Sequence, residues 1–408
     1  MKQCMQYAVG HNHEVKRAAL QLDNHRAAKV GAIGRFLPSV DAGVGAQYNF
    51  GRAIDPETNI YTNVSTFYNG YQLSASLPVF DGFGRVHALR AAKASVLMGQ
   101  SALREQQNLA ALNVMKAYVD ALYYEELAKM ADEKVEEMRL LLKQTRLLEE
   151  VGRKRAADVA QVESQKAEAD YEQTRQQNLR SSALLELKKE MGLPLGEELR
   201  VKGDFNSSLS TLHASLSALH SSLQIACSQM QVAKHEWCQA RASLYPTLSL
   251  GAGLNTAFYH TLHSEAGQPF HSQLKNNMGE YVTLTMSIPL FNRLQTITSI
   301  RKAKNNYRMA CENYEQKLLE LDKLSREAWQ DWQGYQIQVR QMEEKVEADS
   351  IAYELTRRQF EEGLSTAIDL RNTSAQLLNS RATLLQCRLM AVVKEHLVRY
   401  YRGETIWE

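Results

Sequence analysis

The chain contains the same strand-to-helix junction twice, and this duplication constrains its fold more than any other feature. The first copy spans residues 71–85 and the second spans residues 281–293. In each copy a stretch of alternating apolar and polar residues leads into a proline and then into a long charged helical pattern. Pro78 and Pro289 lie 211 residues apart, as do Phe80 and Phe291. We infer an internal duplication that gives two similar halves.

The predicted halves span residues 1–200 and 201–408. Each half is expected to contain a helix, a β-hairpin and a long antiparallel helical hairpin. The β-hairpins are placed at about residues 38–80 and 246–290, and the tips of the helical hairpins near Gly152 and Gly363. The 211-residue offset also relates Gly152 to Gly363 and Asp158 to Asp369. The predicted fold class is therefore mainly α with a small β part.

Long helical patterns without internal proline flank the two tips. They cover residues 85–150 and 156–191 in the first half, and extend to residue 362 and over 366–401 in the second. The first is on the order of 100 Å long, which exceeds any single globular core. Alanine and larger apolar residues recur among Glu, Lys and Gln, as in coiled coils. We expect the aromatic side chains of this pattern to pack between helices, namely Trp329, Trp332 and Tyr335.

Each half also begins with a shorter helical pattern that ends at a proline. In the first half it covers residues 7–34, ahead of Pro38. In the second half it ends at Pro246, and its apolar residues are spaced three and four apart as in a coiled-coil seam: Leu209, Leu212, Leu216, Leu219, Leu223, Ala226, Met230 and Ala233.

Four segments of about ten residues alternate between apolar and small or polar side chains, which predicts strands with two unlike faces. The apolar set comprises Val40, Ala42, Val44, Ala46, Tyr48, Tyr71, Leu73, Ala75, Leu77, Val79, Leu248, Leu250, Ala252, Leu254, Val282, Leu284, Met286 and Ile288. The polar set comprises Asp41, Gln47, Asn49, Gln72, Ser74, Ser76, Ser249, Asn255, Thr283, Thr285 and Ser287.

This alternation is typical of a transmembrane β-barrel with lipid outside and water inside. Four strands cannot close a barrel, and open strand edges are not tolerated in lipid. Several copies must then share one wall, and three copies would supply twelve strands and twelve helical segments. In this reading the polar set faces the lumen, in particular Gln72, Ser74, Ser76, Thr283, Thr285 and Ser287. The alternative is a soluble coiled-coil scaffold or tethering protein whose sheet covers a core.

Composition excludes several other classes of protein. Hydrophobic residues make up 44% of the chain and charged residues 23%, which indicates a folded protein. The net charge of +2 gives no reason to expect a nucleic-acid partner. Five cysteines without a Cys-x-x-Cys pair form neither a disulfide framework nor a zinc pattern. Since no phosphate-binding loop, nucleophile elbow or His-Glu-x-x-His sequence occurs, we expect no enzyme activity and no cofactor.

The sequence also bears on metal binding by histidines and on an export signal at the amino terminus. His260, His263 and His271 fall in the loop between the second pair of strands, and we interpret them as exposed loop residues rather than metal ligands. His11 and His13 are interpreted as surface residues. The first residues lead directly into a helical pattern, so we expect any export signal to be absent from this sequence.

Several short motifs together resemble the TolC family of outer-membrane efflux and secretion channels. They are Leu-Pro-Val-Phe-Asp-Gly at residues 77–82, Ile-Pro-Leu-Phe-Asn at 288–292, Phe-Leu-Pro-Ser-Val at 36–40 and Leu-Tyr-Pro-Thr-Leu at 244–248. The turns at residues 151–159 and 360–370 are similar to the Gly-x-x-Ser/Thr-x-x-Asp-Val/Leu tips of that family. The resemblance covers nearly the whole chain.

The resemblance implies a homotrimer that forms a twelve-stranded transmembrane barrel on a twelve-helix tube. Such a channel lies in the bacterial outer membrane, contacts its lipid and extends into the periplasm. It conducts substrates passively, in efflux or type I secretion. The implied partners are an inner-membrane pump of RND or ABC type and a periplasmic adaptor, also called a membrane fusion protein.

The resemblance also implies roles for residues at the tips. The periplasmic gate or aperture would include Asp158, Phe360, Ser365 and Asp369. The family carries an arginine two residues after the second glycine, where this chain has Ser365. The adaptor would bind at the surrounding tip residues, which are Val151, Gly152, Arg153, Lys154, Arg155, Glu362, Gly363, Leu364 and Thr366.

Two interpretations remain open for the charged tip residues. A threefold ring of Asp158 or Asp369 carboxylates would favour cations, and mutual repulsion would raise their pKa values. Each aspartate also occupies the third position of a helix, where it would cap the helix and complement its dipole. The basic run at residues 153–155 is either a solvated turn or a docking patch for an acidic adaptor tip.

Overall fold

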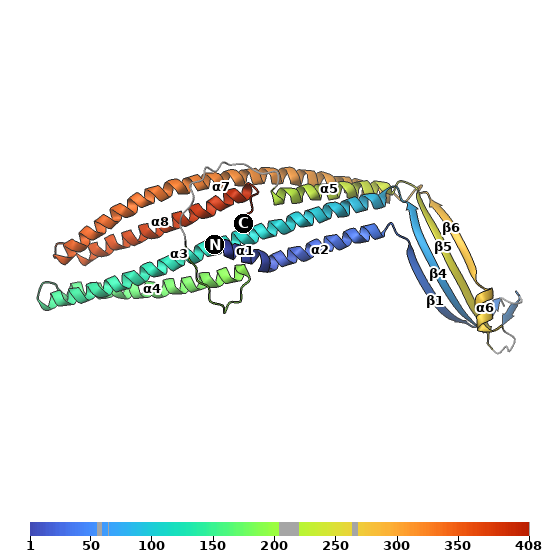
Figure 1. Cartoon of the computed structure of the whole chain (residues 1–408), viewed down its shortest axis with the longest axis horizontal. Coiled ribbons are helices and arrows are strands. Elements are labelled where there is room, and N and C mark those ends of the chain that lie inside the picture. The colour runs from blue at the N-terminus through green and yellow to red at the C-terminus, as the bar shows by residue number, and fades with distance from the viewer. Residues whose placement is uncertain (55–58, 64, 204–219, 263–267, 408) are drawn as a thin grey trace. The chain divides into compact units, whose positions relative to one another are not determined.

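The computed structural model describes residues 1–54, 59–63, 65–203, 220–262 and 268–407 (Figure 1). The chain forms two compact units. One unit comprises Met1–Leu22, Gly99–Ala226 and Tyr314–Glu408, and the other comprises Asp23–Met98 and Cys227–Asn313. Each unit therefore takes segments from both halves of the sequence. His263 and the part of the predicted seam formed by Leu209, Leu212, Leu216 and Leu219 lie outside the described residues.

The four long helices follow the sequence pattern closely. They are α3 (Gly84–Glu150), α4 (Ala156–Met191), α7 (Gln295–Glu361) and α8 (Ala367–Tyr401). Helices α3 and α7 each have 67 residues, and their first and last residues are offset by 211 (295 minus 84, and 361 minus 150). The duplicated sequence thus gives helices of equal length in both halves.

The first helical pattern is interrupted, contrary to the single helix expected over residues 7–34. Helix α1 (Lys2–His11) ends at Asn12, whose backbone is extended, and α2 (His13–Gly34) follows. The Asn12 side chain explains the break, because its Oδ1 accepts a hydrogen bond from the Glu14 backbone N–H and its Nδ2 donates to the Glu190 carbonyl. These bonds give the backbone an alternative to a continuous helix.

The main sheet has four antiparallel strands in the order β1-β4-β5-β6. They are β1 (Ser39–Asn49), β4 (Thr66–Phe80), β5 (Thr247–Thr261) and β6 (Gly279–Ser287). Strands β4 and β5 are longer than the sequence pattern suggested, because paired aromatic residues continue their ladder: the rings of Tyr68 and Tyr259 lie 4.8 Å apart between centroids. The loops between the strands are correspondingly shorter than expected, and they contain three elements that the sequence pattern did not predict: β2 (Arg52–Ile54), β3 (Tyr61–Asn63) and helix α6 (Phe270–Asn276).

The strand register places the two predicted sets of side chains on opposite faces of this sheet. Val44 pairs with Tyr71, Leu73 with Leu254, and Leu250 with Leu284. Because paired residues in an antiparallel sheet project to the same side, the paired apolar residues of all four strands share one face up to Leu77. A bulge between Pro78 and Phe80 shifts the register at Val79, and Ile288 lies beyond the end of β6. The same register puts the six predicted lumen residues together on the other face.

The unit with the long helical hairpins is held together by three clusters of buried residues. The largest joins α1, α3, α4 and α8, and includes Met5, Met115, Leu187 and Leu389. A second cluster joins α3, α4, α7 and α8 near the tips. In the third, Trp332 packs with Ala328 and Val398, and Trp329 packs against them, as the coiled-coil pattern predicted.

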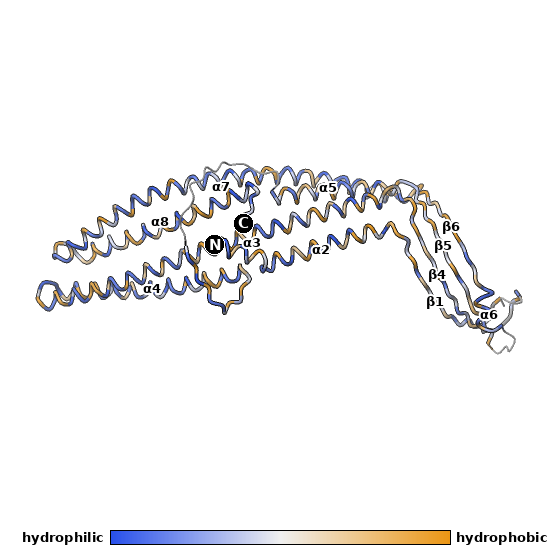
Figure 2. Tube along the Cα trace, in the orientation of Figure 1, coloured by the Kyte–Doolittle hydropathy of each residue, from blue (hydrophilic) through white to orange (hydrophobic). Residues whose placement is uncertain are grey.

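The remaining described helix in the second half is α5 (Ser221–Ala242), which leads into β5. Apolar and polar residues are interleaved along all the long helices, as Figure 2 shows. No helix in the described part of the chain is both long enough and apolar enough to cross a membrane.

Candidate functional site

Both helical hairpins reverse direction through the same turn. Gly152 and Gly363 adopt positive φ angles of 75° and 80°. At the first tip the Arg153 N–H donates to the Leu148 carbonyl, and at the second tip the Leu364 N–H donates to the Gln359 carbonyl. This is the glycine-terminated Schellman motif, which satisfies the last carbonyl groups of a helix. The two glycines are therefore required by the backbone at each tip.

The predicted tip aspartates both cap the helix that follows the turn. Asp369 accepts hydrogen bonds from the Thr366 backbone N–H at 3.1 Å and from the Thr366 hydroxyl at 2.6 Å. The Asp369 N–H donates in return to the Thr366 hydroxyl oxygen, which completes a capping box. Asp158 accepts a hydrogen bond from the Arg155 N–H at 3.1 Å. The capping role proposed for both residues is thus present in the single chain.

The hydrogen bonds from Thr366 hold the pKa of Asp369 below its usual value. Repulsion within a ring of three such carboxylates would act in the opposite direction. The carboxylate of Asp369 is consequently stabilised in its charged form before any neighbouring copy is considered.

Most residues predicted to bind an adaptor are exposed at the tips. Val151 and Leu364 are the large apolar ones, with 68% and 75% of their surface accessible. Arg153, Arg155, Glu362 and Thr366 are also exposed, whereas Lys154 is half-buried, as is the predicted gate residue Ser365. The Ser365 hydroxyl donates to the neighbouring Thr366 carbonyl, at 3.4 Å. Each tip therefore exposes one large apolar side chain next to charged ones.

Phe360 lies inside the protein rather than on the tip surface. Only 2% of it is accessible, and it packs in the cluster near the tips with Met138, Val162 and Leu370. The Lys154 ammonium lies 3.8 Å from the centre of its ring. This cation–π contact joins the first hairpin tip to the last turn of α7.

Two further contacts join the hairpins just behind the tips. The buried Gln165 side chain of α4 donates to the Ala367 carbonyl at the start of α8, at 3.0 Å. Lys134 of α3 donates to the Ser374 hydroxyl of α8 at 2.5 Å, and its ammonium lies over the Tyr353 ring of α7. The two hairpins of one chain are therefore linked by polar as well as apolar contacts.

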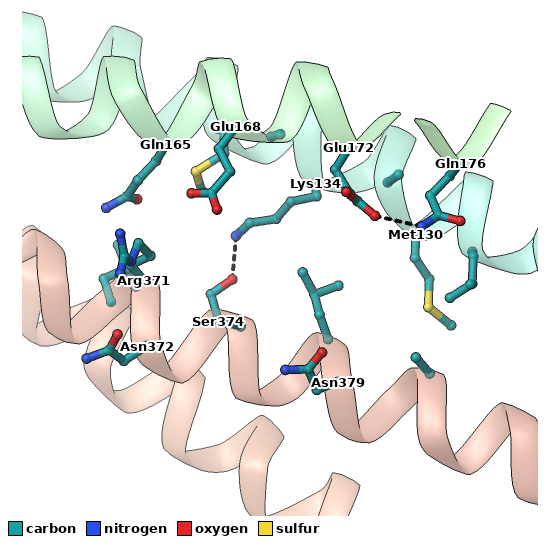
Figure 3. A pocket seen from close by; sticks show the side chains of 18 of the residues that line it. Met130, Lys134, Gln165, Glu168, Glu172, Gln176, Arg371, Asn372, Ser374 and Asn379 are labelled. Atoms are coloured by element: carbon teal, nitrogen blue, oxygen red, sulfur yellow. Dashed lines mark hydrogen bonds between the residues drawn. The ribbon is translucent and has the colours of Figure 1, made fainter. Parts of the chain in front are cut away.

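A groove of about 600 Å³ lies between the two hairpins, next to these contacts (Figure 3). Side chains from α4 and α8 face one another across it, with Lys134 reaching toward Ser374. Its lining combines methionine and alanine side chains with polar and charged groups, namely Met130, Met138, Ala131, Gln165, Glu168, Glu172, Gln176, Arg371, Asn372 and Asn379.

No sequence pattern predicted the groove. Its polar residues recur three and four apart on α4, as Gln165, Glu168, Glu172 and Gln176. That spacing marks one face of a helix, but it is equally typical of a solvated face. Only the packing of α4 near α8 shows that this face lines a groove rather than facing open solvent.

The sequence matches the family described as outer membrane efflux protein over residues 5–193 and 213–396. This chain belongs to that family. The two matched segments lie in the first and second half of the chain respectively, and the match confirms the resemblance recognised from the junction and tip motifs. No curated protein sequence matched the chain.

Solved structures of outer-membrane channels share the fold of this family member. VceC of Vibrio cholerae aligns with a TM-score of 0.83 at 14% identity, covering 99% of this chain and 96% of that one. CmeC of Campylobacter jejuni aligns with a TM-score of 0.86 at 15% identity, covering 98% and 85%. CusC aligns with a TM-score of 0.86 at 18% identity, covering 99% and 92%. At these identities the likeness establishes the fold, which is the mainly helical one with a small antiparallel sheet that was predicted.

Proposed function

We propose that three copies of this chain form a conduit that passively conducts solutes across the outer membrane and periplasm. The strand register is the observation that supports this proposal. The apolar residues of β1, β4, β5 and β6 share one face, and their polar residues share the other. A sheet of this kind separates hydrocarbon from water when it closes into a barrel.

The sheet edges support assembly from several copies. Strands β1 and β6 stand at the two ends of the described sheet, and each has one neighbouring strand in it. Unpaired backbone groups are very costly in lipid, so each edge needs a strand from another copy. Three copies give a twelve-stranded barrel, wide enough to leave an open lumen. Gln72, Ser74, Ser76, Thr283, Thr285 and Ser287 would line this lumen.

The tips would form the periplasmic aperture and the contact with the adaptor. Asp158 and Asp369 would contribute carboxylate rings that favour cations. The exposed Val151 and Leu364, together with Arg153 and Arg155, would contact the adaptor. The groove between the hairpins would extend this surface, because apolar and charged side chains line it together and such a lining suits an amphipathic helix. The pump of RND or ABC type would act through the adaptor.

Reconstitution tests this function directly. The purified protein should behave as a trimer in detergent and produce discrete single-channel conductance steps in a planar bilayer. A conducting trimer is expected because the polar sheet face would then enclose water. A monomer that is stable in buffer without detergent, and that leaves a bilayer non-conducting, would instead favour the soluble scaffold.

A further inference from the structure

Two histidines meet between α3 and α5, close to the point where both helices join the sheet. His87 lies in the first turn of α3, directly after β4, and His235 lies two turns before the end of α5, which leads into β5. Their ring centroids are 5.8 Å apart and the ring planes are inclined by 31°. Since β4 and β5 are paired in the sheet, this contact lies between the two helices that carry its central strands.

Each ring keeps one nitrogen away from water. The Nδ1 atoms of His87 and His235 are both buried, and neither has a hydrogen-bond partner among the residues that the structure describes. Buried polar atoms in folded proteins are almost always paired. Two unpaired ring nitrogens on neighbouring imidazoles therefore call for an explanation.

The surroundings of both rings favour the neutral form. Burial lowers the pKa of His87, and the Arg90 charge lowers it further. Burial is also the main cause of the lowered pKa of His235, with His87, Arg90 and Lys234 adding to it. Neutral imidazole is the form that carries a free nitrogen lone pair and binds metal ions.

The separation of the rings fits a shared metal ion. A metal bound to nitrogen at about 2.0–2.1 Å from two imidazoles holds their ring centres about 4.5–6.5 Å apart, depending on the angle at the metal. The observed 5.8 Å falls within this range. Binding of a shared ion requires that the two side chains rotate so that one nitrogen of each ring reaches it.

We propose that His87 and His235 bind a divalent transition metal such as Zn²⁺ or Ni²⁺ and thereby clamp α3 to α5. Imidazole nitrogen suits these ions, whereas Mg²⁺ and Ca²⁺ require oxygen ligands. No group of three His, Cys, Asp or Glu side chains able to hold a metal occurs in the described part of the chain, so water completes the coordination. This site should bind metal more weakly than a structural zinc centre with four protein ligands, because it has only two and because the positive charges of Arg90 and Lys234 lie nearby.

The test measures metal binding to the full chain, purified in detergent and freed of metal by a chelator. Isothermal titration with Ni²⁺ and Zn²⁺ should give one site per chain, and the thermal midpoint should rise with these ions but not with Mg²⁺. His87→Phe and His235→Phe keep a ring in place but remove the nitrogens. Each should abolish the site and the thermal shift.

The control is His271→Phe, which replaces an exposed histidine of α6 in the same unit. It should retain the site. Substitution with Co²⁺ gives a second readout, because imidazole ligands change its visible absorption from that of the hydrated ion. This change should be lost in both variants even if their stability changes. If a phenylalanine variant does not fold, His87→Gln or His235→Gln replaces it in the same binding measurement. Binding that is absent in the parent protein, or that survives in a folded variant of either His87 or His235, would overturn the proposal.

Discussion

At the scale of single residues, the two tip glycines adopt the same left-handed backbone conformation. Gly152 and Gly363 have positive φ, and a Cβ at either position would meet no atom within 4 Å. Replacement by alanine should therefore cost only the backbone strain of the left-handed conformation, about 1–2 kcal/mol for each position. We expect Gly152→Ala and Gly363→Ala to lower the thermal midpoint by similar amounts.

Gly334 provides the matched control for this prediction. It lies inside α7, and a Cβ there would also meet no atom within 4 Å. Because glycine is unfavourable in a helix interior, Gly334→Ala should stabilise the protein by about 0.5–1 kcal/mol. A stabilising effect of alanine at the two tips would contradict the assigned turn geometry.

His396 predicts a specific pH dependence of stability. Burial is the main reason that its pKa is lowered to about 4, and the charges of Arg399 and Lys2 act in the same direction. An unfolded chain therefore binds a proton at His396 between about pH 6.5 and 4 while the folded chain does not. The contribution of His396 to the free energy of unfolding is therefore fully present above about pH 6.5 and is lost as the pH drops toward 4.

The size of this effect follows from the shift. Between pH 7.5 and 4.5 the loss should be about 2.5 kcal/mol, since one pKa unit corresponds to about 1.4 kcal/mol. Thermal midpoints of the parent and of His396→Gln, measured across this range, should diverge because the variant lacks the titrating group. Parallel pH profiles for the two proteins would show that His396 is not buried in its neutral form.

At the scale of elements, the contact between Lys154 and Phe360 should couple the two hairpin tips. Phe360→Ala removes a buried ring and should cost about 3–5 kcal/mol. Lys154→Met should cost about 0.5–2 kcal/mol, because it removes the cation but keeps the length of the side chain. In the double variant the effect of Lys154→Met should vanish, which a double-mutant cycle on unfolding free energies measures. Additive effects would mean that the contact contributes nothing.

The basic first tip should contribute electrostatically to adaptor binding. Arg153→Glu combined with Arg155→Glu reverses two exposed charges and leaves the packed Lys154 in place. If the adaptor tip is acidic, the variant should bind it more weakly, and its binding should depend less steeply on salt. Surface plasmon resonance at several salt concentrations measures both effects. Unchanged affinity and salt dependence would leave the basic run as a solvated turn.

The sequence was most informative where a local pattern determines an element. Proline, glycine and the capping residues located the ends of the long helices, because these residues act within one helical turn. The break at Asn12 was missed, since it depends partly on a hydrogen bond to Glu190, far away in the sequence. The extension of β4 and β5 was missed for a related reason, because it rests on aromatic pairs between distant strands. Neither contact is visible within a window of neighbouring residues.

For the candidate site, the sequence predicted the positions of the tips but not how the helices pack behind them. The tip residues were found because their motif is repeated, but the inward position of Phe360 and the groove between the hairpins depend on how α3, α4, α7 and α8 pack together. Exposed apolar residues such as Val151 were identified only as part of a motif. Their exposure became evident from the folded chain.

At the scale of the whole molecule, a barrel requires that lipid surrounds one face of the sheet and water the other. The chain belongs to a family of outer membrane efflux proteins, and its register separates apolar from polar side chains across the four strands. Val44 and Leu284 are both well exposed in the single chain, as expected for side chains that would meet lipid in the assembly.

Accessibility of single cysteines in the reconstituted protein tests this claim most directly. The five native cysteines are replaced by serine or alanine, and one cysteine is placed at Val44, Leu284, Ser74 or Thr285 to carry a spin label. The first two labels should be relaxed by oxygen dissolved in lipid, and the last two by a water-soluble nickel chelate, because the register puts the pairs on opposite faces. Equal access of the aqueous reagent to all four positions would contradict the barrel.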